Sequence, residues 1–372
     1  PRGSAKIVSV VVNNAHDDEY FMAKALQLAA RGLNSTAPNP RVGCVIVKNG
    51  RIVGEGWHVS SGEAHAEVLA LKHADSDAAG ATLYVNLEPC AHQGRTPPCV
   101  DAIIKAGINR VVLSARDPNP LVNGKGIERL KANGITVLEG LLAQESIELN
   151  IGFFKRMESG KPWVRVKVAA GLDGKTALDN GKSQWITSEV AREDAHRWRA
   201  RSCVVLTGVG TVVEDDPRLT VRHIETSRQP QKVVVDSQLR SPLSANLFKM
   251  PGVTIATAVT NKEQLDPFVD KGVNVLVLPD SDGRVDLAAL LIELADKHMN
   301  EVLVEAGINL HSALLRRNLI DEMIIYYAPK FLGAQGRGML FLDGLEKMDD
   351  VAEREIIDIK KFGKDFRVTV RF

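Results

Sequence analysis

Cysteines, signal sequences and long apolar runs are scarce or absent in this chain, and each scarcity excludes a class of protein. Only 4 of the 372 residues are cysteines. That is too few for a disulfide framework, so a reducing cytoplasm is expected. No signal peptide and no apolar run long enough to span a bilayer is recognisable, so a membrane protein is not expected. The formal net charge of +1 argues against a broad nucleic-acid-binding surface and an acidic tail.

The length and composition are typical of a soluble globular protein with two domains. Hydrophobic residues make up 44% of the chain and charged residues 25%. The segment Ser159-Gly160-Lys161-Pro162 interrupts a helical pattern, which predicts domains at 16–160 and 161–372. The opening Pro1-Arg2-Gly3-Ser4 resembles the remnant of a protease-cleavage site from an expression vector. Residues 1–15 are therefore interpreted as this remnant and an N-terminal tail.

Hydrophobic periodicity predicts an α/β fold in both halves of the chain. In the first half the strands are expected over 42–47, 52–57, 81–86, 110–115 and 135–138, and the helices over 20–33, 63–72, 99–106, 126–133 and 142–157. The turn Asn49-Gly50 predicts a hairpin between the first two strands. This order predicts a mixed sheet with helices on both faces.

The second half repeats the alternation of strands and helices. Its strands are expected over 163–169, 203–207, 233–236, 254–259, 273–278, 301–305, 322–328, 355–359 and 367–372. Helices are expected over 286–297 and 310–317, and Ser188 is placed to cap a helix that runs to about residue 201.

One histidine and two cysteines form a pattern typical of a catalytic zinc site. His65, Cys90 and Cys99 provide three ligands, and three protein ligands leave the fourth tetrahedral position open for water. Zinc lowers the pKa of such a water toward about 7. Glu67, two residues after the histidine, is placed to miss the metal and to move protons. The order H-x-E, then P-C-x-x-C, is the known pattern of zinc deaminases.

The spacing departs from that pattern in one respect. Eight residues separate Cys90 from Cys99 here, where the pattern has two. Cys99 follows two prolines and is expected to begin a helix, where the dipole favours a thiolate. The alternative is that these are core residues or a structural zinc cluster. The absence of an obvious fourth ligand and the position of Glu67 favour the catalytic interpretation.

Two glycine-bearing strand ends in the second half are suited to a nucleotide. Residues 204–211 predict a strand that enters the turn Gly208-Val209-Gly210, and residues 302–307 predict a strand that enters a helix at Gly307. Neither is a full G-x-G-x-x-G, and each taken alone is more typical of an ordinary turn. Arginines gather nearby and suit a phosphate, although a solvated basic face is the alternative; they are Arg197, Arg199, Arg201, Arg218 and Arg222.

With these residues identified, the sequence resembles the bifunctional riboflavin-biosynthesis deaminase/reductase family over essentially its whole length. In the first half the resemblance rests on Asn39-Pro40-x-Val42-Gly43, Gly62-Glu63-Ala64-His65-Ala66-Glu67, Leu87-Glu88-Pro89-Cys90 through Gly94-Arg95-Thr96-Pro97-Pro98-Cys99, and Asp117-Pro118-Asn119-Pro120. In the second half it rests on Leu172-Asp173-Gly174-Lys175, Gln184-Trp185-Ile186-Thr187, Asp215-Asp216-Pro217-x-Leu219-Thr220 and Val304-Glu305-Ala306-Gly307. The long gap between the cysteines resembles this family's own form. The departures are small: Ala91 and Gly171 stand where the family often has serine.

The resemblance implies a cytidine-deaminase-like α/β/α N-terminal domain and a dihydrofolate-reductase-like α/β C-terminal domain. It implies Zn2+ and NADPH as cofactors. It also implies two steps on a small phosphoribosylaminopyrimidine. The first is hydrolytic deamination of 2,5-diamino-6-(5-phosphoribosylamino)pyrimidin-4-one, and the second is reduction of the ribosyl group to ribityl.

The resemblance also assigns residues to the two sites. For deamination it implies the zinc ligands His65, Cys90 and Cys99, the proton shuttle Glu67, and the substrate contacts Asn39, His58, Arg95, Asp117 and Asn119. For NADPH it implies Ala169, Trp185, Thr211, Asp215, Ser237, Gly307, Ile308, Asn309, Leu310, His311, Ser312 and Ala313. For the reductase substrate it implies Ser183, Arg199, Leu219, Arg222 and Glu305, with Arg199 and Arg222 on the phosphate.

Some alternatives stay open at this point. One rival is a zinc deaminase of a nucleoside or tRNA base with a non-reductase second domain; others are a non-catalytic zinc and nucleotide sensor and a protein with one active half. Lys167 and Asp215 are both candidates for the proton donor of the reduction. The residues do not decide between NADPH and NADH. We expect no nucleic-acid or membrane partner, and we expect a homo-oligomer, a dimer or a tetramer.

Overall fold

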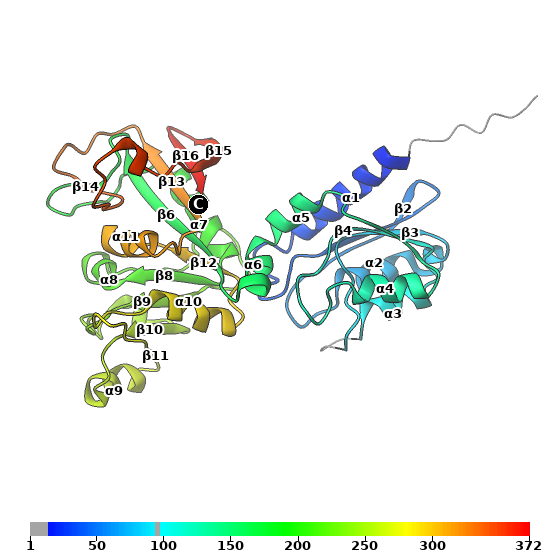
Figure 1. Cartoon of the computed structure of the whole chain (residues 1–372), viewed down its shortest axis with the longest axis horizontal. Helices are drawn as coiled ribbons and strands as arrows, with labels where there is room; N and C mark the ends of the chain where they lie inside the picture. The colour runs from blue at the N-terminus through cyan, green and yellow to red at the C-terminus, as the bar shows by residue number, and fades with distance from the viewer. Residues whose placement is uncertain (1–13, 94–96) are drawn as a thin grey trace, which may run out of the picture. The chain divides into compact units, whose positions relative to one another are not determined.

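The computed structural model describes residues 14–93 and 97–372, and they form two compact units (Figure 1). One unit ends at Asn150 and the other begins at Ile151. The boundary proposed between 160 and 161 lies at the end of the first helix of the second unit. The expected N-terminal tail, 1–15, falls almost entirely outside the described residues.

The first unit contains a five-stranded mixed sheet with the order β2-β1-β3-β4-β5. β1 is antiparallel to β2 and to β3, whereas β3, β4 and β5 are parallel. Asn49 and Gly50 both have positive φ, 52° and 75°, which confirms the hairpin expected from this pair. The strands are β1 (Gly43–Lys48), β2 (Arg51–Trp57), β3 (Thr82–Leu87), β4 (Arg110–Ala115) and β5 (Thr136–Glu139).

Helices cover both faces of this sheet, as the sequence predicted. Alternating strand residues divide the apolar core: Cys44 and Ile46 pack with α2, α3 and α4, whereas Val45 and Val47 pack with α1. This division follows from the two-residue period of a strand. The helices are α1 (Asn14–Ala30), α2 (Ala66–Ala74), α3 (Cys99–Lys105), α4 (Lys125–Ala132) and α5 (Ala143–Leu149), with a 3-10 turn η1 (Asp75–Ala78).

The second unit contains a nine-stranded sheet with the order β11-β10-β9-β8-β12-β6-β13-β16-β15. The strands from β11 to β13 are parallel, and β16 and β15 complete the sheet as antiparallel strands. They are β6 (Trp163–Gly171), β8 (Val204–Gly208), β9 (Gln231–Val235), β10 (Val253–Thr257), β11 (Asn274–Val277), β12 (Glu301–Val304), β13 (Glu322–Ala328), β15 (Glu355–Phe362) and β16 (Asp365–Arg371). A separate short ribbon pairs β7 (Lys175–Ala177) with β14 (Arg337–Gly338).

Helices lie between the parallel strands of this unit along the chain, except α6, which precedes β6. They are α6 (Ile151–Ser159), α7 (Glu189–Arg201), α8 (Val209–Asp215), α9 (Lys262–Asp270), α10 (Leu287–Asp296) and α11 (Ile308–Arg316), with 3-10 turns η2 (Asn246–Lys249) and η3 (Met348–Asp350). Ser188 is the N-cap of α7, as predicted. Its hydroxyl nevertheless donates to Asp365 instead of capping the helix. Among the described residues, no helix has both the length and the apolar character that crossing a membrane requires.

Three expectations about local structure were wrong. The helix expected over 142–157 is two helices, because the amide of Asn150 is held by the backbone of Arg41: it accepts from Arg41 N–H at 2.7 Å and donates to the carbonyl at 3.0 Å. The expected turn after Gly208 is the start of α8, with Gly208 as the N-cap. α9 occurs where no element was expected, and it contains Pro267.

Candidate active sites in the two units

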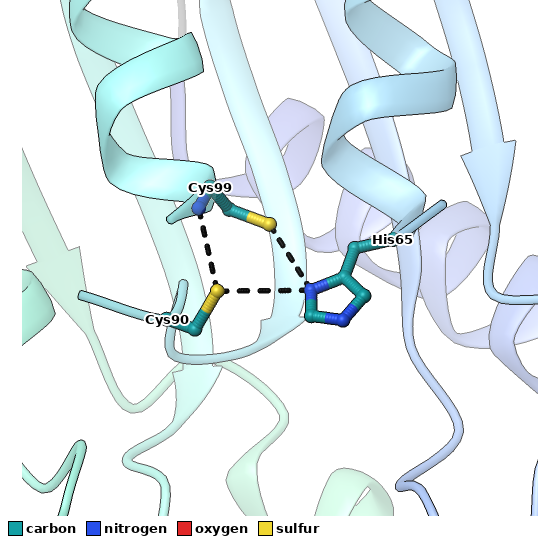
Figure 2. A group of neighbouring side chains, drawn as sticks. All are labelled: His65, Cys90 and Cys99. Atoms are coloured by element: carbon teal, nitrogen blue, oxygen red, sulfur yellow. Dashed lines mark hydrogen bonds between the residues drawn. The ribbon is translucent and has the colours of Figure 1, made fainter. Parts of the chain in front are cut away.

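The three predicted metal ligands meet in the first unit (Figure 2). His65 Nδ1 lies 3.2 Å from Cys99 Sγ and 3.7 Å from Cys90 Sγ. Ligands of a tetrahedral zinc, with bonds of about 2.0–2.3 Å, lie about 3.5 Å from one another. The donor set and its spacing therefore fit Zn2+. Within residues 14–93 and 97–372, this is the one histidine, cysteine and carboxylate group found with such spacing.

Each ligand is positioned by the end of a secondary-structure element. His65 is the N-cap of α2, Cys99 is the first residue of α3, and Cys90 follows β3. Close packing holds α2 in place, because a Cβ atom at Gly54 or Gly56 would lie 2.3 Å from a carbonyl oxygen of that helix. The Cys90 sulfur accepts from the backbone N–H of Cys99 at 3.3 Å. Hydrogen bonding from the Cys99 thiol, with help from His65, lowers the pKa of Cys90, which favours the thiolate form that binds a metal.

Glu67 lies in the first turn of α2 and is 3% exposed. Its Oε2 atom has no hydrogen-bond partner among the described residues. Burial raises the pKa of Glu67, and the nearby Cys90 thiolate adds to this rise. A buried carboxylate oxygen without a protein partner, beside three metal ligands, is suited to a water or a substrate group.

Asn39 and His58 lie together beside this group. The His58 ring packs edge-on against the His65 ring at 5.4 Å. Its Nδ1 lies 3.1 Å from the carbonyl of Ala64, which can only accept, so Nδ1 carries the proton and Nε2 accepts from the Asn39 amide at 3.0 Å. Burial lowers the pKa of His58, which agrees with this neutral form.

Asp117 and Asn119 belong to one hydrogen-bonded loop after β4. Asp117 is buried and accepts from Asn119 N–H at 2.8 Å, and the Asn119 side chain accepts from Leu121 N–H at 3.0 Å. Burial raises the pKa of Asp117 to about 7, and the nearby Glu88 and Cys90 charges contribute. Arg95, the remaining predicted contact, lies outside the described residues.

The sequence patterns assign no role to Glu88, which the structure places between this loop and Cys90. Its carboxylate is 4% exposed and accepts four backbone N–H groups. Glu88 could have been noticed in the sequence as a charged residue between an apolar strand and a metal-ligating cysteine.

In the second unit, Arg199 and Lys167 meet at Glu305, the residue that follows β12. Arg199 from α7 binds both carboxylate oxygens of Glu305, with the Nη2 contact at 2.9 Å, and Lys167 from β6 lies 3.0 Å from Oε2. Although burial favours the neutral acid, Arg199 and Lys167 hold the pKa of Glu305 well below its usual range. Arg199 also donates to the carbonyl of Thr220 at 3.0 Å, so most of its guanidinium is committed within the protein.

Ser183 and Asp215 lie on one cavity of about 450 Å³, together with Arg337. The Gln184 amide donates to Asp215 at 3.4 Å. Burial raises the pKa of Asp215, and Glu214 adds to the rise. Trp185 is exposed, with the Arg192 guanidinium 4.6 Å from its ring centroid.

The other predicted contacts lie at or beyond the carboxyl ends of the parallel strands β6, β8, β9 and β12. Ala169 is in β6, Thr211 is in α8 after β8, Ser237 follows β9, and residues 307–313 form the start of α11 after β12. The carboxyl edge of an open parallel sheet is where ligands bind. Within the described residues, no hydrogen bond or ion pair joins Ala169, Thr211 or Ser237 to Glu305.

Two further positions have features that suit ligand binding. Leu219 has a positive φ of 51°, which is uncommon for a bulky residue. The His311 ring is 3% exposed, and its Nε2 has no partner among the described residues. Burial lowers the pKa of His311 to about 4.

Comparisons with known proteins agree with this division of the chain. The cytidine and deoxycytidylate deaminase zinc-binding region matches residues 15–115, and the RibD C-terminal domain matches residues 162–368. The riboflavin biosynthesis protein RibD of Escherichia coli K12 is 47% identical over 360 residues, which cover 94% of this chain and 97% of that protein.

Two solved structures are similar over nearly the whole chain. The RibD of Acinetobacter baumannii has a TM-score of 0.90 at 44% identity and covers 96% of this chain and 99% of its own. A diaminohydroxyphosphoribosylaminopyrimidine deaminase/5-amino-6-(5-phosphoribosylamino)uracil reductase of Thermotoga maritima has a TM-score of 0.86 at 34% identity, with the same coverage.

These matches confirm the predicted fold class and both predicted activities. A deaminase with a non-reductase second domain is not supported, because the second unit matches the RibD C-terminal domain over almost all of its length. Zn2+ and NADPH are the cofactors of such a protein. The chain therefore belongs to the RibD family and is a bifunctional deaminase and reductase of riboflavin biosynthesis.

Proposed function

We propose that the first unit removes the 2-amino group of 2,5-diamino-6-(5-phosphoribosylamino)pyrimidin-4-one as ammonia, and that the second unit then reduces the ribosyl group to ribityl with NADPH. The observation that carries the first step is the partnerless Oε2 of Glu67 beside His65, Cys90 and Cys99. The match of the RibD C-terminal domain begins at residue 162, which supports 16–160 and 161–372 as the functional domains.

In the deamination, His65, Cys90 and Cys99 hold zinc, which supplies the Lewis acidity that activates a water for hydrolysis. Glu67 takes one proton from the attacking water and gives it to the pyrimidine ring nitrogen. It then takes the remaining hydroxyl proton and gives it to the amino group, which leaves as ammonia while the carbonyl forms. Asn39, His58, Asp117, Asn119 and Arg95 bind the substrate. Since the Asn39 amide already donates to His58, His58 acts as a neutral residue that orients Asn39.

In the reduction, NADPH supplies hydride to C1′ of the ribose in an imine or ring-opened form. Ala169, Trp185, Thr211, Asp215, Ser237 and residues 307–313 bind the cofactor, and Ser183, Arg199, Leu219, Arg222 and Glu305 bind the substrate. Lys167, which pairs with Glu305, and Asp215, whose pKa burial raises, are the two candidates for the proton donor. No nucleophilic residue is required, because positioning and charge stabilisation carry the protein's share of the reaction.

The phosphate of the reductase substrate is expected to bind mainly Arg222. Burial and the nearby Arg199 and Arg218 charges lower the pKa of Arg222, and an anion would relieve this repulsion. Replacing Arg222 with Ala removes a charge-assisted hydrogen bond of about 1.5–3 kcal/mol. The KM of the reduction should therefore rise roughly 10- to 150-fold, measured from NADPH oxidation with the deaminated intermediate. An Arg197→Ala control removes an exposed arginine paired with Glu193, and an equal KM rise in the control would contradict the assignment.

The whole proposal is tested by supplying the diaminopyrimidinone phosphate and following ammonia release and NADPH oxidation in one cuvette. We expect ammonia first, then NADPH oxidation that depends on it. Ammonia without NADPH oxidation would contradict the second step, and no ammonia from the zinc-loaded protein would contradict the first.

We also propose a homo-oligomer, a dimer or a tetramer, which associates through β15. This strand ends the nine-stranded sheet, and its Ile356 and Ile359 are 58% and 64% exposed. An exposed apolar edge strand is a template for pairing with a second copy. Ile359→Lys should lower the mass measured by light scattering, whereas Val269→Lys on the exposed side of α9 should not. A monomeric parent protein, or an unchanged mass for Ile359→Lys, would contradict this interface.

A cytoplasmic location is proposed as well. All 4 cysteines are free in the structure, and the metal group needs two of them as thiols. Cell fractionation with an antibody to the chain tests this location, and recovery outside the cytoplasmic fraction would contradict it.

A further inference from the structure

We propose that Glu88 is a positioning residue for deamination, which holds the substrate-binding loop at 117–127 against the strand end that carries Cys90. This inference rests on the proposed function, because it takes Asp117 and Asn119 to be substrate contacts.

The Glu88 carboxylate joins this loop through four backbone N–H donors. Its Oε2 accepts from Asp117 at 3.3 Å and from Gly124 at 2.9 Å. Its Oε1 accepts from Gly126 at 2.9 Å and from Ile127 at 3.3 Å. Two of these donors lie in the first turn of α4, where a negative charge is favoured by the helix dipole.

Glu88 takes no direct part in the deamination, because its carboxylate is fully hydrogen-bonded within the protein. The side chain is 4% exposed, and each oxygen accepts two N–H groups. It lies outside the group of metal-ligating atoms. The carboxylate therefore acts through the residues whose backbone it binds.

The residues whose backbone Glu88 binds include or adjoin the proposed substrate contacts. Glu88 binds the N–H of Asp117 itself, and the Asp117 carboxylate in turn accepts from Asn119 N–H at 2.8 Å. At the far end of the loop, Gly126 lies so close to the metal-binding strand end that a Cβ there would be 2.2 Å from the Pro89 carbonyl oxygen. One carboxylate thus ties Asp117 and the start of α4 to the segment Glu88-Pro89-Cys90.

The test replaces Glu88 with Gln in the full-length, zinc-loaded protein. The side-chain NH2 of glutamine cannot accept hydrogen bonds from the two backbone N–H groups that it would face. Two of the four hydrogen bonds are therefore lost, and we expect the loop to shift. We expect the KM for the diaminopyrimidinone phosphate to rise about tenfold or more, while kcat changes less. Bound zinc should stay at about one per chain, and NADPH oxidation with the deaminated intermediate should be unchanged.

Two further variants test whether the change in KM comes from the contact that Glu88 makes. Glu128→Gln makes the same change of charge at an exposed position of α4 and should leave KM unchanged. Gly126→Ala places a methyl group against the Pro89 carbonyl oxygen without a change of charge. It should therefore raise the KM for the diaminopyrimidinone phosphate as Glu88→Gln does. Amide hydrogen exchange at Asp117, Gly124, Gly126 and Ile127 should accelerate in Glu88→Gln.

Three outcomes would overturn the inference. An unchanged KM in Glu88→Gln, with ammonia release intact in the parent protein, removes the positioning role alone. Loss of zinc from both Glu88→Gln and Gly126→Ala assigns Glu88 to the metal site or the fold instead. No ammonia from the parent protein removes the proposed function, and this inference with it.

Discussion

Replacing Glu67 with Gln should strongly slow ammonia release and leave zinc in place. The amide cannot take a proton from water, so the rate should fall by about 10²–10⁴, the usual worth of general acid–base catalysis. Glu67 is not among the metal-ligating atoms, and so the metal content should be that of the parent protein. Ammonia release at saturating substrate and zinc content by atomic absorption are the measurements.

The matched control for this change is Glu55→Gln, which alters an exposed carboxylate of β2. It should leave ammonia release at the parental rate. Turnover in Glu67→Gln within a factor of about three of the parent would show that another group moves the proton.

Removing one metal ligand should separate the two activities of the chain. Cys90→Ser takes away one of two thiolate ligands, and we expect zinc binding and ammonia release to be lost together. The reductase unit has its own core and its own sheet. NADPH oxidation with the deaminated intermediate should therefore continue at the parental rate.

The control for the cysteine change is Cys203→Ser in the second unit, where the sulfur accepts from Asn300 N–H at 3.3 Å and a hydroxyl can do the same. This variant should keep zinc and ammonia release. A chelator should reproduce the effect of Cys90→Ser on the parent protein, and added Zn2+ should reverse it. Ammonia release from a zinc-free protein would be inconsistent with the role given to His65, Cys90 and Cys99.

Local chemistry determined much of this protein before any tertiary contact was known. The Asn49-Gly50 turn and the positions of most strands depend on neighbouring residues in the chain, and residue type and motif identified the ligand set His65, Cys90 and Cys99. The same is true of Glu67, because one residue separates it from His65 and the start of α2 fixes its direction. Such features follow from periodicity, turn preference and ligand type.

Other features depend on partners far apart in the chain, and only the tertiary structure decided them. Asn150 ends a helix because it binds Arg41, and Arg199 is largely committed to Glu305 and Thr220. The role of Glu88 arises because its carboxylate meets N–H groups some thirty residues later in the chain. A buried carboxylate or guanidinium forms hydrogen bonds with the donors or acceptors that packing places beside it. The spacing of residues along the sequence does not predict which partners these are.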